Sequence, residues 1–128
     1  QIRRFSTCRF PRHLVLSPDS ETLYVTCTQG SVGLYRVDTG ERIGLGGVGI
    51  NPRSMDLSGD GRFVATANFG LGGTKRGSVS IVDLLHRTHH STFIDRVHRL
   101  VGLSIRPGSK LRVYATSWDT SEVIALEP

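Results

Sequence analysis

The sequence predicts an all-β fold built from repeated four-stranded antiparallel units, and two observations lead to that prediction. The phrase PRHLVLSPDSETLYVT at residues 11–26 returns as NPRSMDLSGDGRFVAT at residues 51–66. Short segments rich in β-branched and aromatic residues alternate with turns that contain Gly, Asp and Pro, which is typical of strands joined by tight turns. No segment longer than about ten residues shows the 3.6-residue apolar period of a helix.

A third and more diverged copy, LVGLSIRPGSKLRVYATS, covers residues 100–117. A second phrase recurs after each copy, as GSVGLYRVD (30–38), GSVSIVD (77–83) and SEVIALE (121–127). A repeat of about 40 to 47 residues that holds four strands is the blade of a β-propeller. A β-sandwich gives no reason to restate the Pro-Arg phrase 41 residues later. The sequence therefore predicts a β-propeller segment of about three four-stranded antiparallel blades.

The strands of each expected blade follow from their composition. In the first blade, residues 11–46, they are expected at HLVLS, TLYVTC, SVGLYRV and ERIGLG. In the second, residues 51–95, the corresponding segments are SMDLS, RFVATAN, SVSIVDL and STFID. The third, residues 98–127, contains GLSIR, LRVYATS and EVIALE. Because Asp and Gly suit tight turns, we expect Asp19 and Asp60 to cap the turns PDSE and GDGR.

Residues 1–6 are expected to form a lone outer strand that completes a blade. This strand and the missing fourth strand of the third blade are complementary, as they would be in a closed ring. Three blades alone fall below the roughly four to eight blades of a propeller. Two possibilities stay open: the further propeller blades come from the rest of a longer chain, or several copies close a ring together.

Composition and charge exclude several classes of protein. The net charge is +5, but the arginines are scattered singly and the few aromatic residues do not alternate with them. A nucleic-acid partner is therefore not expected. No apolar run reaches the roughly 18 residues that span a bilayer, which predicts no membrane span. Cys8 and Cys27 lack the CxxC spacing of zinc and redox sites, and the sequence leaves open whether they form a disulfide or stay as two thiols.

Basic residues recur where the first strand of each expected blade begins, and in a propeller this strand lines the central channel. These residues are Arg12, His13, Arg53, His98 and Arg99. A guanidinium group offers a planar fork of donors that suits a carboxylate or a phosphate. The sequence therefore predicts a ligand- or anion-binding site at one mouth of the channel, with a protein or a small anionic ligand as partner. The competing interpretation, that these arginines bond to neighbouring blades, stays open.

The remaining polar residues form no recognisable catalytic constellation. His86, His89 and His90 lie close together, but no Cys or carboxylate stands at a metal-ligand spacing, so we expect a solvated turn and no metal site. Trp118, the only tryptophan, is expected to pack between blades, and the alternative is a partly exposed contact anchor for a partner. No P-loop, GxSxG or HExxH motif is present, and the sequence predicts no cofactor.

The repeats resemble the YVTN-type propeller repeat found in YncE-like proteins. The resemblance covers residues 10–126 and rests on Pro-Arg, on Ser-Pro-Asp and on the triplet Tyr24-Val25-Thr26, which carries the name of the repeat. Cys27 stands where that family has Asn. The resemblance implies a closed ring of about seven blades. It also implies a non-enzymatic binding or scaffold module that is periplasmic, on the cell surface or secreted.

The phrase PRHLVLSPD also resembles the Pro-Arg-His strand of lactonase-type propellers, which act on sugar lactones. Only Arg12 and His13 match that motif, and the acidic partner of that family has no counterpart in this sequence. Because no unique catalytic constellation is found, the sequence favours a binding module over an enzyme. The lactonase-type enzyme remains the alternative.

Overall fold

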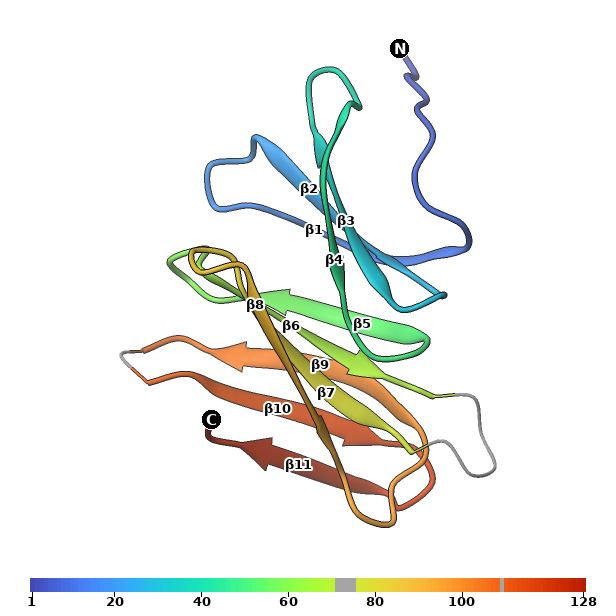
Figure 1. Cartoon of the computed structure of the whole chain (residues 1–128), viewed down its shortest axis with the longest axis vertical. Helices are drawn as coiled ribbons and strands as arrows, with labels where there is room; N and C mark the ends of the chain where they lie inside the picture. Colours follow the sequence, from blue (N-terminus) through green and yellow to red (C-terminus); the bar gives the residue numbers. More distant parts are fainter. Residues whose placement is uncertain (71–75, 109) are drawn as a thin grey trace.

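The computed structural model describes residues 1–70, 76–108 and 110–128, which form three antiparallel sheets that lie side by side (Figure 1). We call these sheets the first, second and third blade. The first blade holds β1 (Pro11–Leu16), β2 (Thr22–Cys27), β3 (Ser31–Arg36) and β4 (Arg42–Gly47). Strands that follow one another in the sequence are also neighbours in the sheet, so the order is β1-β2-β3-β4.

The other two blades repeat this arrangement. The second blade consists of β5 (Pro52–Leu57), β6 (Phe63–Asn68), β7 (Ser78–Asp83) and β8 (Thr88–Phe93). The third blade has three strands, β9 (Leu100–Arg106), β10 (Arg112–Ser117) and β11 (Glu122–Leu126). No helix occurs in the described ranges. The predicted fold class, an all-β segment of antiparallel propeller blades, is confirmed.

The first strands of the three blades form the inner layer of the structure. β1 contacts β5 and β5 contacts β9, whereas β4, β8 and β11 lie at the opposite edges of their sheets. The three inner strands run in the same direction (Figure 1). Their first residues therefore lie at the same end of the row of blades, which is where the sequence places the channel mouth.

Apolar side chains between the sheets form the core. Tyr24 and Val32 of the first blade pack with Met55 and Val64 of the second. A larger cluster joins the second and third blades and contains the buried residues Ala65, Ala67, Val79, Val97, Leu100, Ile105, Val113 and Ala115. Side chains alternate between the two faces of a strand, so each blade directs one apolar set toward its neighbour. Each blade therefore depends on the next one to bury its apolar face.

Residues 1–6 form no strand, contrary to the expectation for this segment. They run along the first blade, where the Arg3 guanidinium donates hydrogen bonds to the carbonyls of Val37 and Asp38. A lone strand needs a free sheet edge as its partner. The expected edge is that of β11, which belongs to the third blade at the other end of the row (Figure 1). Pairing of residues 1–6 with such an edge stays a prediction.

The repeated turns are capped by the repeated aspartates, as expected. The Ser17 hydroxyl donates to Asp19, whose carboxylate accepts the Glu21 N–H. The same bonds recur in the second blade, where Ser58 donates to Asp60 and Asp60 accepts the Arg62 N–H. The Ser-x-Asp phrase is thus a local device that closes the turn between the first two strands of a blade.

Cys8 and Cys27 form a disulfide that fastens the segment before β1 to the end of β2. The sequence left this pairing open. Cys27 pairs with Pro11 in the first sheet just as Asn68 pairs with Pro52 in the second. By the same step of 41 residues, Cys8 corresponds to Gly49.

Where the first blade has the Cys8–Cys27 disulfide, the second blade has a buried polar network around Asn68. The Asn68 amide donates to the hydroxyls of Ser78 (3.0 Å) and Ser80 (2.8 Å) and accepts from Thr66 (2.9 Å). The Gly49 N–H donates to Ser80 as well, and a Cβ at Gly49 would collide with the Asn68 amide. The glycine is therefore required for the close approach of the two segments. The first blade makes the equivalent junction with a covalent bond.

Candidate functional site

The inner strands β1 and β5 each contain a β-bulge near their first residue, at the expected mouth. The register shifts between Pro11 and Leu14 in the first blade and between Pro52 and Ser54 in the second. A bulge adds an unpaired residue and re-aims the side chains beside it. Arg12, His13 and Arg53 lie within these bulges, so the irregularity sets the direction of these candidate side chains.

Threonine hydroxyls satisfy the backbone groups that the bulges leave unpaired. The His13 N–H donates to Thr26 Oγ1 at 2.9 Å, and the Gly102 N–H donates to Thr116 Oγ1 at 2.9 Å. An intramolecular hydrogen bond of this kind contributes about 0.5 to 1.5 kcal/mol to stability. These two threonines therefore hold the inner strands in their bulged form, in addition to suiting a strand by propensity.

Two arginines from different blades lie over one aromatic ring. Phe69 follows the last residue of β6, and its ring centroid lies 4.2 Å from the guanidinium carbon of Arg53 and 5.9 Å from that of Arg99. Arg53 comes from the second blade, and Arg99 immediately precedes β9 of the third. Each cation–π contact contributes about 0.5 to 2 kcal/mol, depending on its exposure to water. The ring therefore joins two blades and fixes two positive charges beside each other.

The charges at this place have the same sign. Arg12 is close enough to Arg53 that its charge acts on the Arg53 guanidinium. Partial burial, followed by this charge, lowers the pKa of Arg53 from its ordinary value, and the group nevertheless stays protonated at neutral pH. Among the described residues, Arg53 Nε is buried without a hydrogen-bond partner. The ion pairs found there involve other arginines. We call Arg12, Arg53, Phe69 and Arg99 the mouth cluster.

His98 and Arg99 are not the third-blade counterparts of Arg12 and His13. They precede the inner strand, which begins at Leu100. The repeated hydrogen bonds show the correspondence: the N–H of Trp118 donates to the Arg99 carbonyl, as Thr28 N–H does to the Phe10 carbonyl. Leu100 takes the place of the leading proline of the repeat, so His98 and Arg99 lie before the inner strand.

The two histidines of the predicted site, His13 and His98, form hydrogen bonds through their backbone N–H groups. The His98 N–H donates to Asp119, and its Nδ1 is buried without a partner in the described part of the chain. His13 is half-buried and engages Thr26 through its backbone. Within the described ranges, no hydrogen bond or ion pair joins Arg12 or His13 to a carboxylate. The lactonase alternative depends on such a partner and stays a prediction.

Two aromatic residues of the mouth differ from what the sequence indicated. Trp118 is 68% exposed, so it does not pack between blades as expected. Phe69 was not singled out from the sequence at all. The two residues correspond, since each follows the last residue of the second strand of its blade. An alignment of the copies on their strand ends would have identified both as mouth residues.

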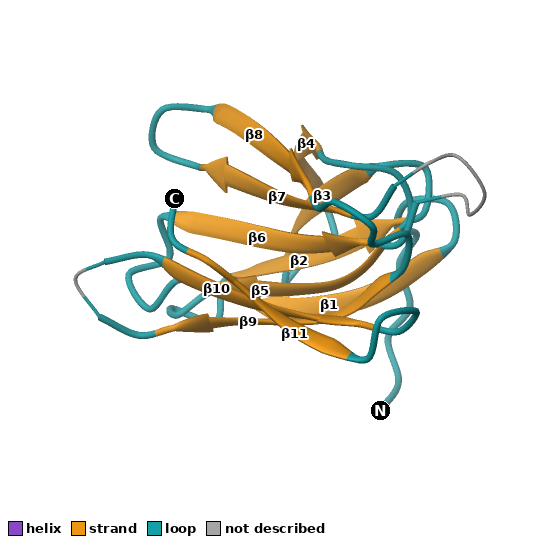
Figure 2. Cartoon of the chain, turned by 90° about the horizontal axis from the view of Figure 1, so that it is seen from below, coloured by secondary structure: helices purple, strands orange, loops and turns teal. Residues whose placement is uncertain are grey.

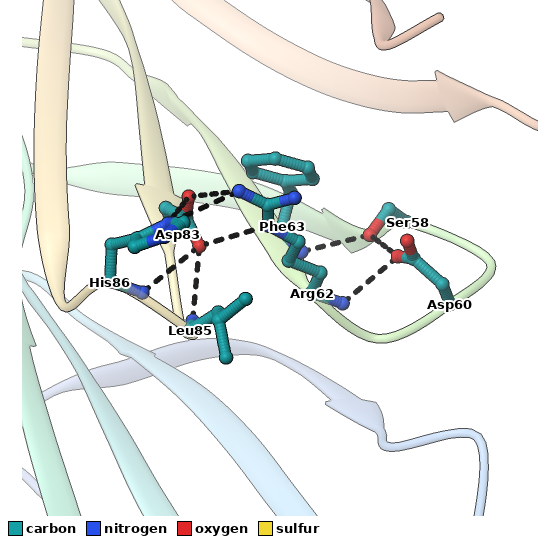
Figure 3. Close-up of polar contacts among 7 residues, drawn as sticks. All are labelled: Ser58, Asp60, Arg62, Phe63, Asp83, Leu85 and His86. Carbon is teal, nitrogen blue, oxygen red and sulfur yellow. Dashed lines mark hydrogen bonds and ion pairs between the residues drawn. The ribbon is translucent and has the colours of Figure 1, made fainter. Parts of the chain in front are cut away.

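A second polar cluster lies at the other end of β6 (Figure 3). Arg62 donates to both carboxylate oxygens of Asp83, at 3.2 and 2.8 Å, and His86 Nδ1 lies 2.8 Å from the same carboxylate. The Arg62 hydrogen bonds, followed by that of His86, hold the pKa of Asp83 well below its usual range. His86 is therefore part of a charged cluster that fixes the turn after β7.

We expect Asp83 to make stability depend on pH in the acid range. Its pKa is lowered in the folded state, so its contribution is complete above the unfolded-state pKa of about 3.9 and is lost as the pH falls toward the folded-state value. The Tm difference between the wild type and Asp83→Asn should be largest above pH about 4 and shrink below it. Thermal unfolding followed by circular dichroism from neutral to acidic pH measures this difference. A difference that does not change with pH would contradict the assignment.

The described part of the chain contains no group of three or more His, Cys, Asp or Glu side chains that could hold a metal ion. The described residues also include no helix long and apolar enough to cross a membrane. His89 and His90 are exposed on β8.

Comparison with known proteins places the fold. No family model and no curated protein sequence matches the chain. The β-propeller domain of Cps50 (Swd1) from Myceliophteria thermophila matches 98% of the chain with a TM-score of 0.77 at 16% identity. Hydrazine synthase from Kuenenia stuttgartiensis matches all of it with a TM-score of 0.67 at 19% identity. The WD40 repeats of RRP9 match 95% with a TM-score of 0.62 at 18% identity.

The chain spans only part of these proteins. It covers 35% of the Cps50 chain, 39% of the hydrazine synthase chain and 38% of the RRP9 chain. Identities this low establish the fold alone. The chain has a β-propeller fold, built from antiparallel blades.

Proposed function

We propose that this chain is the binding module of a β-propeller and that the mouth cluster binds a carboxylate-bearing, acidic segment of a partner protein. The observation that carries the proposal is the stack of Arg53 and Arg99 over Phe69. Guanidinium groups bind carboxylates through paired hydrogen bonds. The ring holds both groups in place before binding, so less side-chain entropy is lost when the partner arrives.

The electrostatics of the mouth cluster support an anionic partner. Arg12 adds a third positive charge next to Arg53, and like charges in one place repel one another. A carboxylate would relieve this repulsion. It would also give hydrogen-bond acceptors to the guanidinium group of Arg53, whose buried Nε has no partner among the described residues. Trp118, which is exposed at the same end of the third blade, can add apolar contact area.

The proposed mouth is completed by further blades. Propellers close into rings of about four to eight blades, and this chain supplies three sheets. The further blades come from the rest of a longer chain or from other copies, and residues 1–6 then pair with an outer edge such as that of β11. Both arrangements would place more loops around the mouth cluster.

We place this module in the periplasm, on the cell surface or among secreted proteins. The Cys8–Cys27 disulfide supports this location, because disulfides persist in oxidising compartments. The resemblance of the repeats to the YVTN type supports it as well. Reaction of the protein isolated from its native compartment with a thiol reagent tests the location: modification of both cysteines without prior reduction would contradict it.

Replacing both stacked arginines should weaken the binding of an acidic peptide by about 10- to 100-fold, since a hydrogen bond to a charged group contributes about 1.5 to 3 kcal/mol. The variant is Arg53→Ala/Arg99→Ala, and a short polyglutamate peptide serves as the probe. Isothermal titration calorimetry at low ionic strength measures the affinity. The affinity of the wild type should also fall as salt is added, because the contact is partly exposed.

Arg106→Ala/Arg112→Ala is the matched control. It removes two positive charges, as the test variant does, from the last residue of β9 and the first residue of β10, at the opposite end of these strands. The control should bind the peptide as the wild type does. Equal affinities of the wild type and the double variant, with both folded by circular dichroism, would show that the mouth cluster is not the binding site.

A further inference from the structure

A groove separates the outer strands of the first and second blades. It has a volume of ≈ 600 Å³, and its lining includes Leu34, Gly46, Val82, Leu84 and Arg87. β4 and β8 flank it, and Figure 2 shows these two strands next to each other. The groove lies away from the mouth cluster, because β4 and β8 are the last strands of their sheets and the mouth begins at the first ones.

The groove exists because β4 lacks a side chain at Gly46. In the sheet, Gly46 pairs with Val32, so the two residues share a face, and Val32 is part of the core with the second blade. A Cβ added at Gly46 would meet no atom within 4 Å. The position therefore points toward the second blade and leaves open space there.

The repeat shows what fills the corresponding space elsewhere in the chain. By the step of 41 residues that relates Pro11 to Pro52, the counterpart of Gly46 is Phe5. The Phe5 ring packs against Tyr35 of the first blade, with ring centroids 6.3 Å apart, and covers Gly40. An aromatic ring thus occupies the junction in front of the first blade.

The wall of the groove corresponds to the wall that Phe5 covers. Thr22 pairs with Arg36 as Phe63 pairs with Asp83, so Val82 is the counterpart of Tyr35 and Arg87 that of Gly40. Gly40 and Arg87 both have positive φ angles, 74° and 54°, which confirms that the two turns match. The groove is therefore the counterpart of the place that the Phe5 ring fills, and Gly46 supplies no side chain to it.

The rim of the groove carries the positive charge of Arg87, and the imidazole of His89 also lines it. The one carboxylate in the lining, that of Asp83, is already bound by Arg62 and His86. Leu45, also in the lining, is 59% exposed. The site thus combines an apolar hollow with a basic edge.

We propose that this groove is a docking site for an aromatic side chain that a partner protein presents on an extended acidic segment. The aromatic ring enters beside Gly46 as Phe5 does in front of the first blade, and the flanking carboxylates face Arg87 and His89. This second site is independent of the mouth cluster, because none of its residues belongs to that cluster.

Filling the groove from within should abolish docking. Gly46→Phe places a ring in the open space, and Gly46 has no positive φ that would strain the substitution. We expect its Tm to rise by a few degrees, since an apolar side chain becomes buried. The full 128-residue chain is titrated with an acidic peptide that carries a single central phenylalanine, and ¹H–¹⁵N spectra report the perturbed residues.

The wild type should show peptide-dependent shifts at Val82, Leu84 and Arg87, and Gly46→Phe should bind at least about tenfold more weakly. Gly59→Phe is the matched control: a Cβ at this exposed turn position would also meet no atom within 4 Å, and Gly59 does not line the groove, so this variant should bind as the wild type does. Arg87→Glu should weaken binding without filling the groove. The same peptide with alanine at its centre should not bind.

Several outcomes would overturn the proposal. One is unchanged affinity of Gly46→Phe for the peptide. Another is the absence of shifts at the groove at millimolar peptide. A third is a native mass that falls from dimer to monomer in Gly46→Phe, because the occupant would then be a second copy of this chain. Loss of binding in Arg53→Ala/Arg99→Ala alone would assign the peptide to the mouth cluster instead.

Discussion

Replacing Asn68 with alanine is expected to lower the free energy of unfolding by about 3 kcal/mol. The Asn68 side chain is 1% exposed and bonds three neighbours, the hydroxyls of Thr66, Ser78 and Ser80. Its removal leaves the Thr66 hydroxyl without its acceptor and creates a small cavity. A buried polar group that loses its partner costs about 1 to 3 kcal/mol, and a cavity adds to this cost. Equilibrium unfolding in urea measures the change.

Ser91→Ala provides the graded comparison. Ser91 makes one hydrogen bond, to the Ser80 hydroxyl at 2.7 Å, at the half-buried edge of the same network. Its loss should cost about 1 kcal/mol. If Asn68→Ala were no more destabilising than Ser91→Ala, the network would not hold the second blade together as described.

Removing the disulfide should cost a similar amount. Cys8 and Cys27 are separated by 19 residues, and closing a loop of that length lowers the entropy of the unfolded chain enough to contribute about 3 kcal/mol. The variant Cys8→Ser/Cys27→Ser leaves no free thiol. Urea unfolding of this variant, and of the wild type under reducing conditions, measures the loss.

The two measurements should agree, since both remove the same cross-link. Hydrogen exchange adds a local readout: the backbone around Tyr35 should exchange faster once residues 1–8 are released, because the Phe5 ring covers this region. A variant as stable as the oxidised wild type would show that the disulfide does not fasten this segment.

The repeated phrases of the sequence predict much of the fold. Pro11 and Pro52 mark the beginning of the inner strands, and the Ser-x-Asp turns at Asp19 and Asp60 form the same hydrogen bonds in both blades. Such features are local, since the residues that make them are close in the sequence. They predict strands and turns, and their period predicts the blade.

The candidate site was only partly predictable, because it depends on contacts between blades. The arginines were recognised by their recurrence, but the ring that holds Arg53 and Arg99 was not. Phe69 follows a strand of one blade and meets a residue in front of the next blade, and only the packing of the two sheets brings these residues together. The bulge that re-aims Arg53 is likewise a property of pairing, which the sequence of one strand does not show.

The third blade shows how divergence misleads. Leu100 takes the place of the leading proline, so His98 and Arg99 lie before the inner strand, whereas Arg12 and His13 lie within theirs. Residues 1–6 form no strand in this structure, and their pairing with an outer edge stays a prediction, because a strand forms only where an edge is available.

The measurement that tests the central claim most directly is the Nε–H resonance of Arg53 during titration with the polyglutamate peptide. This donor is buried and lacks a partner among the described residues, so a bound carboxylate should accept a hydrogen bond from it or from the adjacent guanidinium nitrogens. We expect a saturable shift of the Arg53 and Arg99 side-chain signals, with the same affinity as in calorimetry. Binding that saturates while both signals stay unchanged would contradict the assignment of the mouth cluster as the binding site.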